Sequence, residues 1–259
     1  MNHRFQPPRA PQKPLAIGPE AASPPAWPSY TGTSQLVGTS PSGRVTVYVD
    51  PSLGAPALKN AQDLLQDADR VVSANDSIFG TTGGPVSAIV FALGGATDGT
   101  GGADHLGCHY STGNAIEVDA SYGNSARVSA LFEAELSECS MNGNLCGEST
   151  GEALSRWCAA AVGNNALADF ATAPQWASDG MPDWVDKTED TDQDADSIGC
   201  DMAFLSWMIR AMVWKKLPRP WSTSAIPEPS PNSTPLLPPT AQATRGPIFR
   251  RRFTACRMG

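Results

Sequence analysis

One stretch, from Val128 to Met141, places acidic residues inside sequence that is otherwise apolar and has the periodicity of a helix. Its apolar residues and two glutamates, Glu135 and Glu138, recur at spacings of three and four. This spacing puts both glutamates on the face that helical periodicity assigns to the interior. An ionised carboxylate is tolerated in an interior only where it is paired, hydrogen-bonded or bound to a metal. We therefore expect a functional site on this stretch.

A second helical segment, from about residue 151 to 162, carries a further acid, Glu152, close to its start. If the two helices fold back on each other, Glu152 comes close to Glu135 and Glu138. Three carboxylates suit a hard divalent cation, and one of them can act as a general base towards water polarised by that cation.

The same glutamates also have a structural interpretation. Glu138 or Glu152 could form an ion pair with Arg127 or Arg156. Glu152 could also simply stabilise the N-terminus of its helix, where negative charge is favourable. The sequence leaves both interpretations open.

The order of patterns along the chain predicts one α/β (α+β) domain, with a small mixed sheet followed by the glutamate-bearing helix and C-terminal helices. The expected elements are strand 44–49, helix 57–72, strands 85–93 and 115–118, and helices 124–141, 151–162 and 197–217. The last helix is apolar nearly all round, which predicts that it packs in the core. Proline-rich sequence at 1–41 and 218–259 predicts a disordered leader and a disordered tail, so the domain is expected to span 42–217.

Charge and composition limit the classes of partner. The net charge of −8 argues against nucleic acid, because phosphate binding needs clustered Lys and Arg. No apolar run approaches the roughly 18 residues of a membrane-spanning helix, and the N-terminus lacks the apolar region of a secretory signal, so a soluble protein is expected. The six cysteines include no C-x-x-C pair, which argues against a zinc knuckle. The expected partner is a small-molecule or peptide substrate.

An acidic run at 189–196 has alternating aspartates, among them Asp190, Asp192 and Asp194. Alternating oxygen ligands in a tight loop are typical of Ca²⁺ sites. The run lacks the turn-making glycine and the bidentate glutamate of such a loop. Its alternative interpretation is a solvated acidic loop that caps the last helix.

Two histidines, His105 and His109, lie outside the leader and have Cys108 between them. Imidazole and thiolate are good ligands for transition metals at neutral pH, so both histidines are possible metal ligands. Alternatively, they are polar loop residues near a cleft.

The sequence 147–151 matches the G-x-S-x-G pattern in which Ser149 would be the nucleophile of a serine esterase. That arrangement needs a strand directly before the serine and a histidine later in the chain. Here a turn precedes Ser149 and no histidine follows His109. The start of a helix is the alternative interpretation.

Two motifs, Ala134-Glu-Leu-Ser-Glu138 and Gly151-Glu-Ala-Leu-Ser-Arg156, together resemble the zincin metallopeptidases, particularly the gluzincin-type basic-secretory-protein group. In that family an H-E-x-x-H helix supplies two zinc ligands and the general base, and a glutamate of a following helix supplies the third ligand. The resemblance implies that Glu135 keeps the base position and Glu152 the third-ligand position. Ala134 and Glu138 stand where the family has its histidines. The chain also resembles bacterial proteins that share the A-E-L-S-E, G-E-A-L-S-R and S-I-G-C segments.

These observations predict a zincin-like domain that performs metal-assisted hydrolysis of an amide, ester or lactone, with Ca²⁺ or Zn²⁺ as the cofactor. Glu135 is the expected base, and Glu138 and Glu152 are the expected metal-binding or orienting groups. The competing prediction is a non-catalytic, calcium-stabilised binding or structural module on a degenerate metallopeptidase fold.

Overall fold

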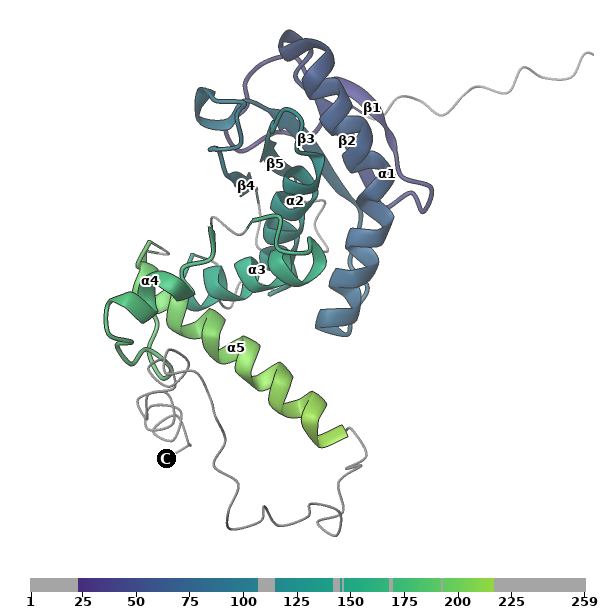
Figure 1. Cartoon of the computed structure of the whole chain (residues 1–259). Helices are drawn as coiled ribbons and strands as arrows, with labels where there is room; N and C mark the ends of the chain where they lie inside the picture. Colours follow the sequence, from purple (N-terminus) through teal and green to yellow (C-terminus); the bar gives the residue numbers. More distant parts are fainter. Residues whose placement is uncertain are drawn as a thin grey trace, which may run out of the picture.

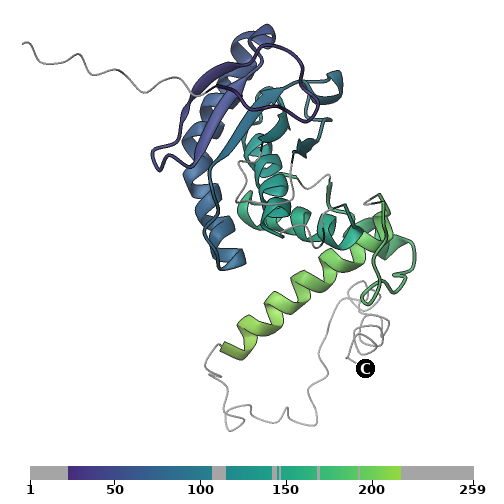
Figure 2. The same cartoon turned by 180° about the vertical axis from the view of Figure 1, so that it is seen from behind.

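The computed structural model of the chain describes residues 23–106, 115–141, 145, 147–167, 170–191 and 193–216, the last five of them by backbone alone. Within these residues one five-stranded mixed sheet packs with five α-helices in a single small domain, as the sequence predicts (Figures 1 and 2). The strands are β1 (Gln35–Thr39), β2 (Val45–Val49), β3 (Val86–Phe91), β4 (Ala103–His105) and β5 (Ala115–Asp119). The helices are α1 (Gly54–Phe79), α2 (Ser125–Ser140), α3 (Ser149–Val162), α4 (Ala173–Ser178) and α5 (Ala195–Lys216).

The sheet has the strand order β1-β2-β3-β5-β4. The three inner strands, β2, β3 and β5, run parallel, and the edge strands β1 and β4 are antiparallel to their neighbours. Parallel strands are buried on both faces, which explains why β2 and β3 have nearly continuous apolar sequence. The edge strands β1 and β4 and the short helix α4 were not predicted.

Helices α1 and α2 cover one face of the sheet, and the main core lies between these two layers (Figure 1). Helix α1 contributes buried residues at helical spacing, namely Ala57, Ala61, Leu64, Ala68, Val71 and Val72. It is longer than the predicted 57–72 and ends at Gly80, whose left-handed backbone (φ 68°) directs its N–H to the carbonyl of Asp76.

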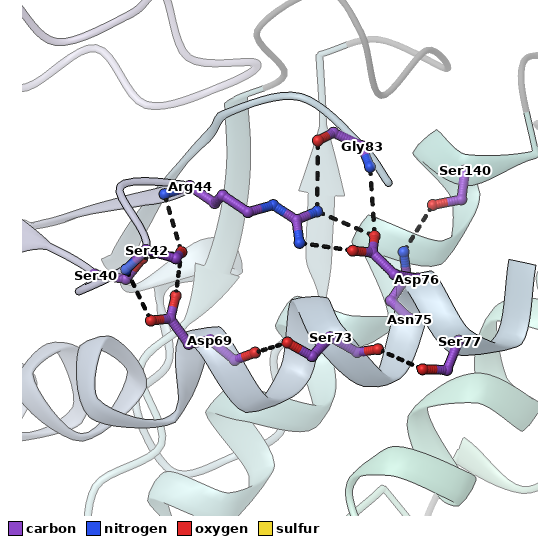
Figure 3. Close-up of polar contacts among 10 residues, drawn as sticks. All are labelled: Ser40, Ser42, Arg44, Asp69, Ser73, Asn75, Asp76, Ser77, Gly83 and Ser140. Atoms are coloured by element: carbon purple, nitrogen blue, oxygen red, sulfur yellow. Dashed lines mark hydrogen bonds and ion pairs between the residues drawn. The ribbon is translucent and has the colours of Figure 1, made fainter. Parts of the chain in front are cut away.

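Polar contacts fix the C-terminal half of α1 to the β1–β2 turn (Figure 3). Arg44 binds both carboxylate oxygens of Asp76, at 2.6 and 3.0 Å. The hydroxyl of Ser42 donates to Asp69. On the α2 side of the same helix, the amide of Asn75 donates to the hydroxyl of Ser140 at 2.9 Å. These contacts hold α1 against both the sheet and α2.

An N-terminal segment packs against the other face of the sheet. The backbone N–H groups of Ser29 and Tyr30 donate to the buried carboxylate of Glu117, at 3.0 and 2.7 Å. Trp27 lies edge-on to Tyr48, which belongs to the same small cluster of buried apolar residues. The predicted boundary at residue 42 is corrected accordingly, because residues 23–41 include β1 and this packed segment. High proline content disfavours helices and inner strands, but it permits an extended segment and an edge strand. Residues 1–22 and 217–259 lie outside the described part of the chain.

Helix α5 departs from the prediction that its apolar residues pack in the core. Ile198 and Met202, in its first turns, are buried against Ala153 of α3. Further along, Trp207 and Ile209 are 42% and 41% exposed, because this part of α5 extends beyond the body of the domain (Figure 2). No helix in the described residues is both long enough and apolar enough to cross a membrane.

Candidate metal centre

Helix α2 carries the central acidic residues. It begins after Asn124, whose side chain accepts a hydrogen bond from the N–H of Arg127 at 3.2 Å and so caps the first turn. The helix contacts α1, α3, β4 and β5, and therefore nearly all of its residues are buried. Because α2 is enclosed on several sides, any acidic side chain on it has to find a partner or hold a proton.

A histidine from the neighbouring edge strand meets the two predicted glutamates. His105, the last residue of β4, places its Nδ1 atom 2.7 Å from Oε2 of Glu135 and 3.9 Å from Oε2 of Glu138. The ligand atoms of the three residues all lie within 4.8 Å of one another, and we call this group the His–Glu–Glu cluster. The side chains are only 10% to 13% exposed. Since Glu135 and Glu138 are three residues apart on a helix, they share the face that points to β4.

The electrostatics of the cluster follow from burial and from the closeness of the carboxylates. Burial, together with the charges of Glu135 and Glu152, raises the pKa of Glu138 to about 8. Burial also raises the pKa of Glu135, against the opposing hydrogen bond from His105. Burial disfavours the charged imidazole, but the hydrogen bond to Glu135 and the surrounding carboxylates outweigh it and raise the pKa of His105. Glu138 thus retains its proton near neutral pH.

The third predicted glutamate, Glu152, lies on α3 and does not belong to the His–Glu–Glu cluster, so the three glutamates do not converge as predicted. Its carboxylate accepts a hydrogen bond from Nε of Arg156 at 2.5 Å, so the predicted ion pair is present. Arg156 also donates to the carbonyl of Phe170, and its guanidinium lies over the ring of that residue. The charge of Glu152 still raises the pKa values of Glu135 and Glu138. The charge of Glu152 therefore affects the pKa values of the cluster, while the ion pair with Arg156 fixes the side chain of Glu152.

The alternative nucleophile, Ser149, is fully buried at the start of α3. Its hydroxyl lies 2.6 Å from Oγ of Ser197 and accepts a hydrogen bond from the N–H of Glu189 at 2.8 Å. Neither partner is a base that could activate a nucleophile. These contacts match the alternative interpretation of Ser149 as part of a helix start, joined to the loop before α5.

The acidic run before α5 contributes a helix cap. Oδ1 of Asp194 accepts a hydrogen bond from the N–H of Ser197 at 2.7 Å, in the first turn of α5. Asp190 is exposed. Asp192, like His109, lies outside the described residues. Within the part of the chain that the structure describes, the His–Glu–Glu cluster is the one group of three or more His, Cys, Asp or Glu side chains close enough to share a metal ion.

A residue that the sequence interpretation overlooked is Glu133. Its side chain is fully buried, and neither carboxylate oxygen has a hydrogen-bond partner among the residues that the structure describes. Burial raises its pKa to about 9, so the group is neutral at physiological pH. The periodicity of the stretch places Glu133 away from the face of Glu135 and Glu138, and only the enclosure of α2 by other helices makes it an interior residue.

Comparisons with known proteins add little to this geometry. No family model matches the chain, and no curated protein sequence is similar to it. Among solved structures, yeast LTA4 hydrolase in complex with bestatin matches with 14% identity and a TM-score of 0.36, over 70% of this chain and 30% of that one. The chain thus spans less than a third of the length of that protein, and a TM-score this low supports no statement about function.

Proposed function

We propose that this chain is a metal-assisted hydrolase that acts on a carbonyl substrate, with the His–Glu–Glu cluster as its metal site. The observation that carries the proposal is the meeting of His105 with Glu135 and Glu138, which come from elements that are separate in sequence. Buried acidic and basic groups that converge and shift one another's pKa values are typical of active sites.

The donor set fits a divalent ion. Ligand atoms around a four-coordinate zinc ion would lie roughly 3.4 Å apart, because each bond is about 2.0–2.2 Å long. The ligand atoms of the group lie within 4.8 Å of one another, and Nδ1 of His105 is 2.7 Å from Oε2 of Glu135, so their separations bracket that spacing. A mixed set of imidazole and carboxylate favours Zn²⁺ over Ca²⁺, which prefers six to eight oxygen ligands.

The roles follow from the resemblance of the two motifs to the zincin pattern. His105 and Glu138 would hold the ion, with Glu152 beside them, and His105 would supply an imidazole that the motif itself lacks at Ala134. A divalent ion bound there would supply Lewis acidity towards a carbonyl and a water molecule. Glu135 takes the proton from the attacking water, and its raised pKa suits a base that works near neutral pH. An amide, an ester and a lactone all require these same groups, so the substrate is a small molecule or peptide with such a bond.

The test combines metal analysis of the purified protein with a chelator-controlled panel of peptide, ester and lactone substrates. Glu138→Gln is expected to lower the bound metal, whereas Glu135→Gln is expected to keep the metal and lose about 10²- to 10⁴-fold in turnover. The matched control is Glu133→Gln on the same helix, since this carboxyl is already neutral and lies outside the cluster. The control should keep both metal and turnover.

Two outcomes would contradict the proposal in different ways. If Glu135→Gln keeps full activity, Glu135 is not the base. If the protein binds no divalent metal and hydrolyses nothing on the panel, the binding or structural module is the better description. A chelator-sensitive activity would in turn exclude that module.

A further inference from the structure

The loop that leads into β4 is packed against a buried aspartate. Asp119, the last residue of β5, is fully buried. Its carboxylate lies so close to Gly101 that a Cβ atom added to that glycine would be 2.3 Å from Cγ and 2.6 Å from both carboxylate oxygens. The N–H of Asp119 also donates to the carbonyl of Gly102 at 3.0 Å. Asp119 therefore contacts the loop through both its side chain and its backbone, and the loop has no room for a side chain at residue 101.

An arginine from α2 also binds this loop. Nη2 of Arg127, in the first turn of α2, donates to the carbonyl of Gly101 at 3.2 Å. The Cδ atom of this arginine would also lie 3.4 Å from a Cβ added to Gly99. Burial raises the pKa of Asp119 to about 6, and the charge of Arg127 opposes this. The loop is thus clamped between the end of β5 and the start of α2.

Strand β4 pairs antiparallel with β5, and this clamp lies directly before it in the chain. It has only three residues, begins two residues after Gly101, and ends at His105. Ala103 is the one apolar residue of β4 that packs against the core, and it is only partly buried, so apolar packing contributes little to placing the strand. The helix whose Arg127 binds the loop also carries Glu135 and Glu138. One helix therefore carries both glutamates and also binds the loop that precedes His105.

We propose that Asp119 and Arg127 are positioning residues that act through Gly101 to set His105 against Glu135 and Glu138. That these residues form a metal centre rests on the function proposed above, but the placement of His105 does not.

The test compares two adjacent glycines. Gly101→Ala introduces a methyl group into the Asp119 carboxylate, whereas a Cβ at Gly102 would meet nothing within 4 Å. Neither glycine has a positive φ, so the pair differs in contact and not in backbone strain. The first measurement is the NMR signal of the His105 imidazole N–H in the metal-free protein, assigned with His105→Gln. The second is the affinity for Zn²⁺ by calorimetry.

Gly101→Ala is expected to abolish the low-field imidazole signal and to weaken Zn²⁺ binding about tenfold or more, the range known for groups that orient metal ligands. Gly102→Ala should change neither quantity. Gly101→Ala and Asp119→Ala act on one contact. The double variant should therefore bind Zn²⁺ no more weakly than Asp119→Ala alone.

The outcomes separate this inference from the proposed function. If the wild-type chain binds no Zn²⁺ but Gly101→Ala alone removes the imidazole signal, the positioning role stands and the metal centre does not. If Gly101→Ala leaves the signal and the affinity unchanged, the positioning role is overturned while the metal centre is untouched. Should Gly101→Ala fail to fold, Arg127→Met serves instead, and an unchanged imidazole signal in that folded variant would equally overturn the inference.

Discussion

The two sides of helix α2 both contain buried glutamates, yet they stabilise these residues differently. On the side towards α1 and α3, Glu133 has no hydrogen-bond partner within the described part of the chain, and the charges that act on its pKa are those of Arg70 and Asp76 on α1. On the side towards β4, Glu135 and Glu138 share the imidazole of His105. One side buries a single acid, and the other brings acids and a base together.

The difference shows that burial alone does not indicate a functional carboxylate. Glu133 avoids the free-energy cost of a buried charge by keeping its proton up to a pH of about 9. The carboxylates of the cluster have an imidazole within reach, and the ligand atoms of the three residues lie close enough to one another to share a metal ion. Convergence of several groups, rather than the perturbed pKa of one, is what marks the β4 side as a site.

The largest expected effect is the pH dependence of stability that Glu133 produces. Its pKa is about 9 in the folded chain against an ordinary value of 4.5, so between these pH values the folded state holds a proton that the unfolded state has lost. The free energy of unfolding should then decrease by about 1.4 kcal/mol for each pH unit as the pH rises from about 5 towards 9. Glu133→Gln should lack this contribution.

Chemical denaturation of both proteins at pH 5, 7 and 9 measures the effect. The advantage of Glu133→Gln over the wild type should grow with pH to several kcal/mol. The other titrating groups are the same in both proteins and cancel in the difference. Parallel stability curves would mean that Glu133 has a partner or a solvent path, and the contrast between the two sides of α2 would disappear.

The next effect belongs to the β4 side. His105→Gln removes the imidazole from the cluster and keeps a polar side chain of similar size. Zn²⁺ affinity should fall by about 100-fold or more, since even groups that only orient a ligand are worth 10- to 100-fold. The free energy of unfolding of the metal-free protein should change little, because β4 is a short edge strand. Calorimetric titration and thermal melting with and without Zn²⁺ measure these quantities, and undiminished affinity would remove His105 from the site.

The predictability of the fold follows the strength of local patterns. Strands β2, β3 and β5 and helices α1, α2, α3 and α5 agree with the sequence because each has a sustained apolar run or a helical period. The short elements β4 and α4 have too few residues for such a pattern, and their formation depends on neighbours that are distant in sequence. Strand β1 is as long as β2 and β5, but the proline-rich composition around it hid its pattern.

The candidate site was predictable to the same extent. The spacing of Glu135 and Glu138 is a local property of one helix and can be recognised in sequence. The approach of His105 depends on the pairing of β4 with β5 and on the Gly101 contact, which are long-range. Glu133 could not be recognised as buried, because its burial depends on helices that pack on the remaining sides of α2. The exposure of Trp207 and Ile209 could not be predicted either. Helical periodicity shows which residues share a face, but not where a helix extends beyond the domain.

The smallest effect tests whether the two sides of α2 are independent. Ser140→Ala removes the acceptor of the buried Asn75 amide, a contact between α1 and α2 shown in Figure 3. Loss of one partner of a buried hydrogen bond should lower the free energy of unfolding by about 1–3 kcal/mol. Zn²⁺ affinity should stay at the wild-type value, because Ser140 lies outside the His–Glu–Glu cluster. If Ser140→Ala instead weakens the metal site as much as it weakens the fold, then α2 transmits packing changes from its α1 side to its β4 side, and the contrast between an inert and a functional side would have to be replaced by one coupled helix.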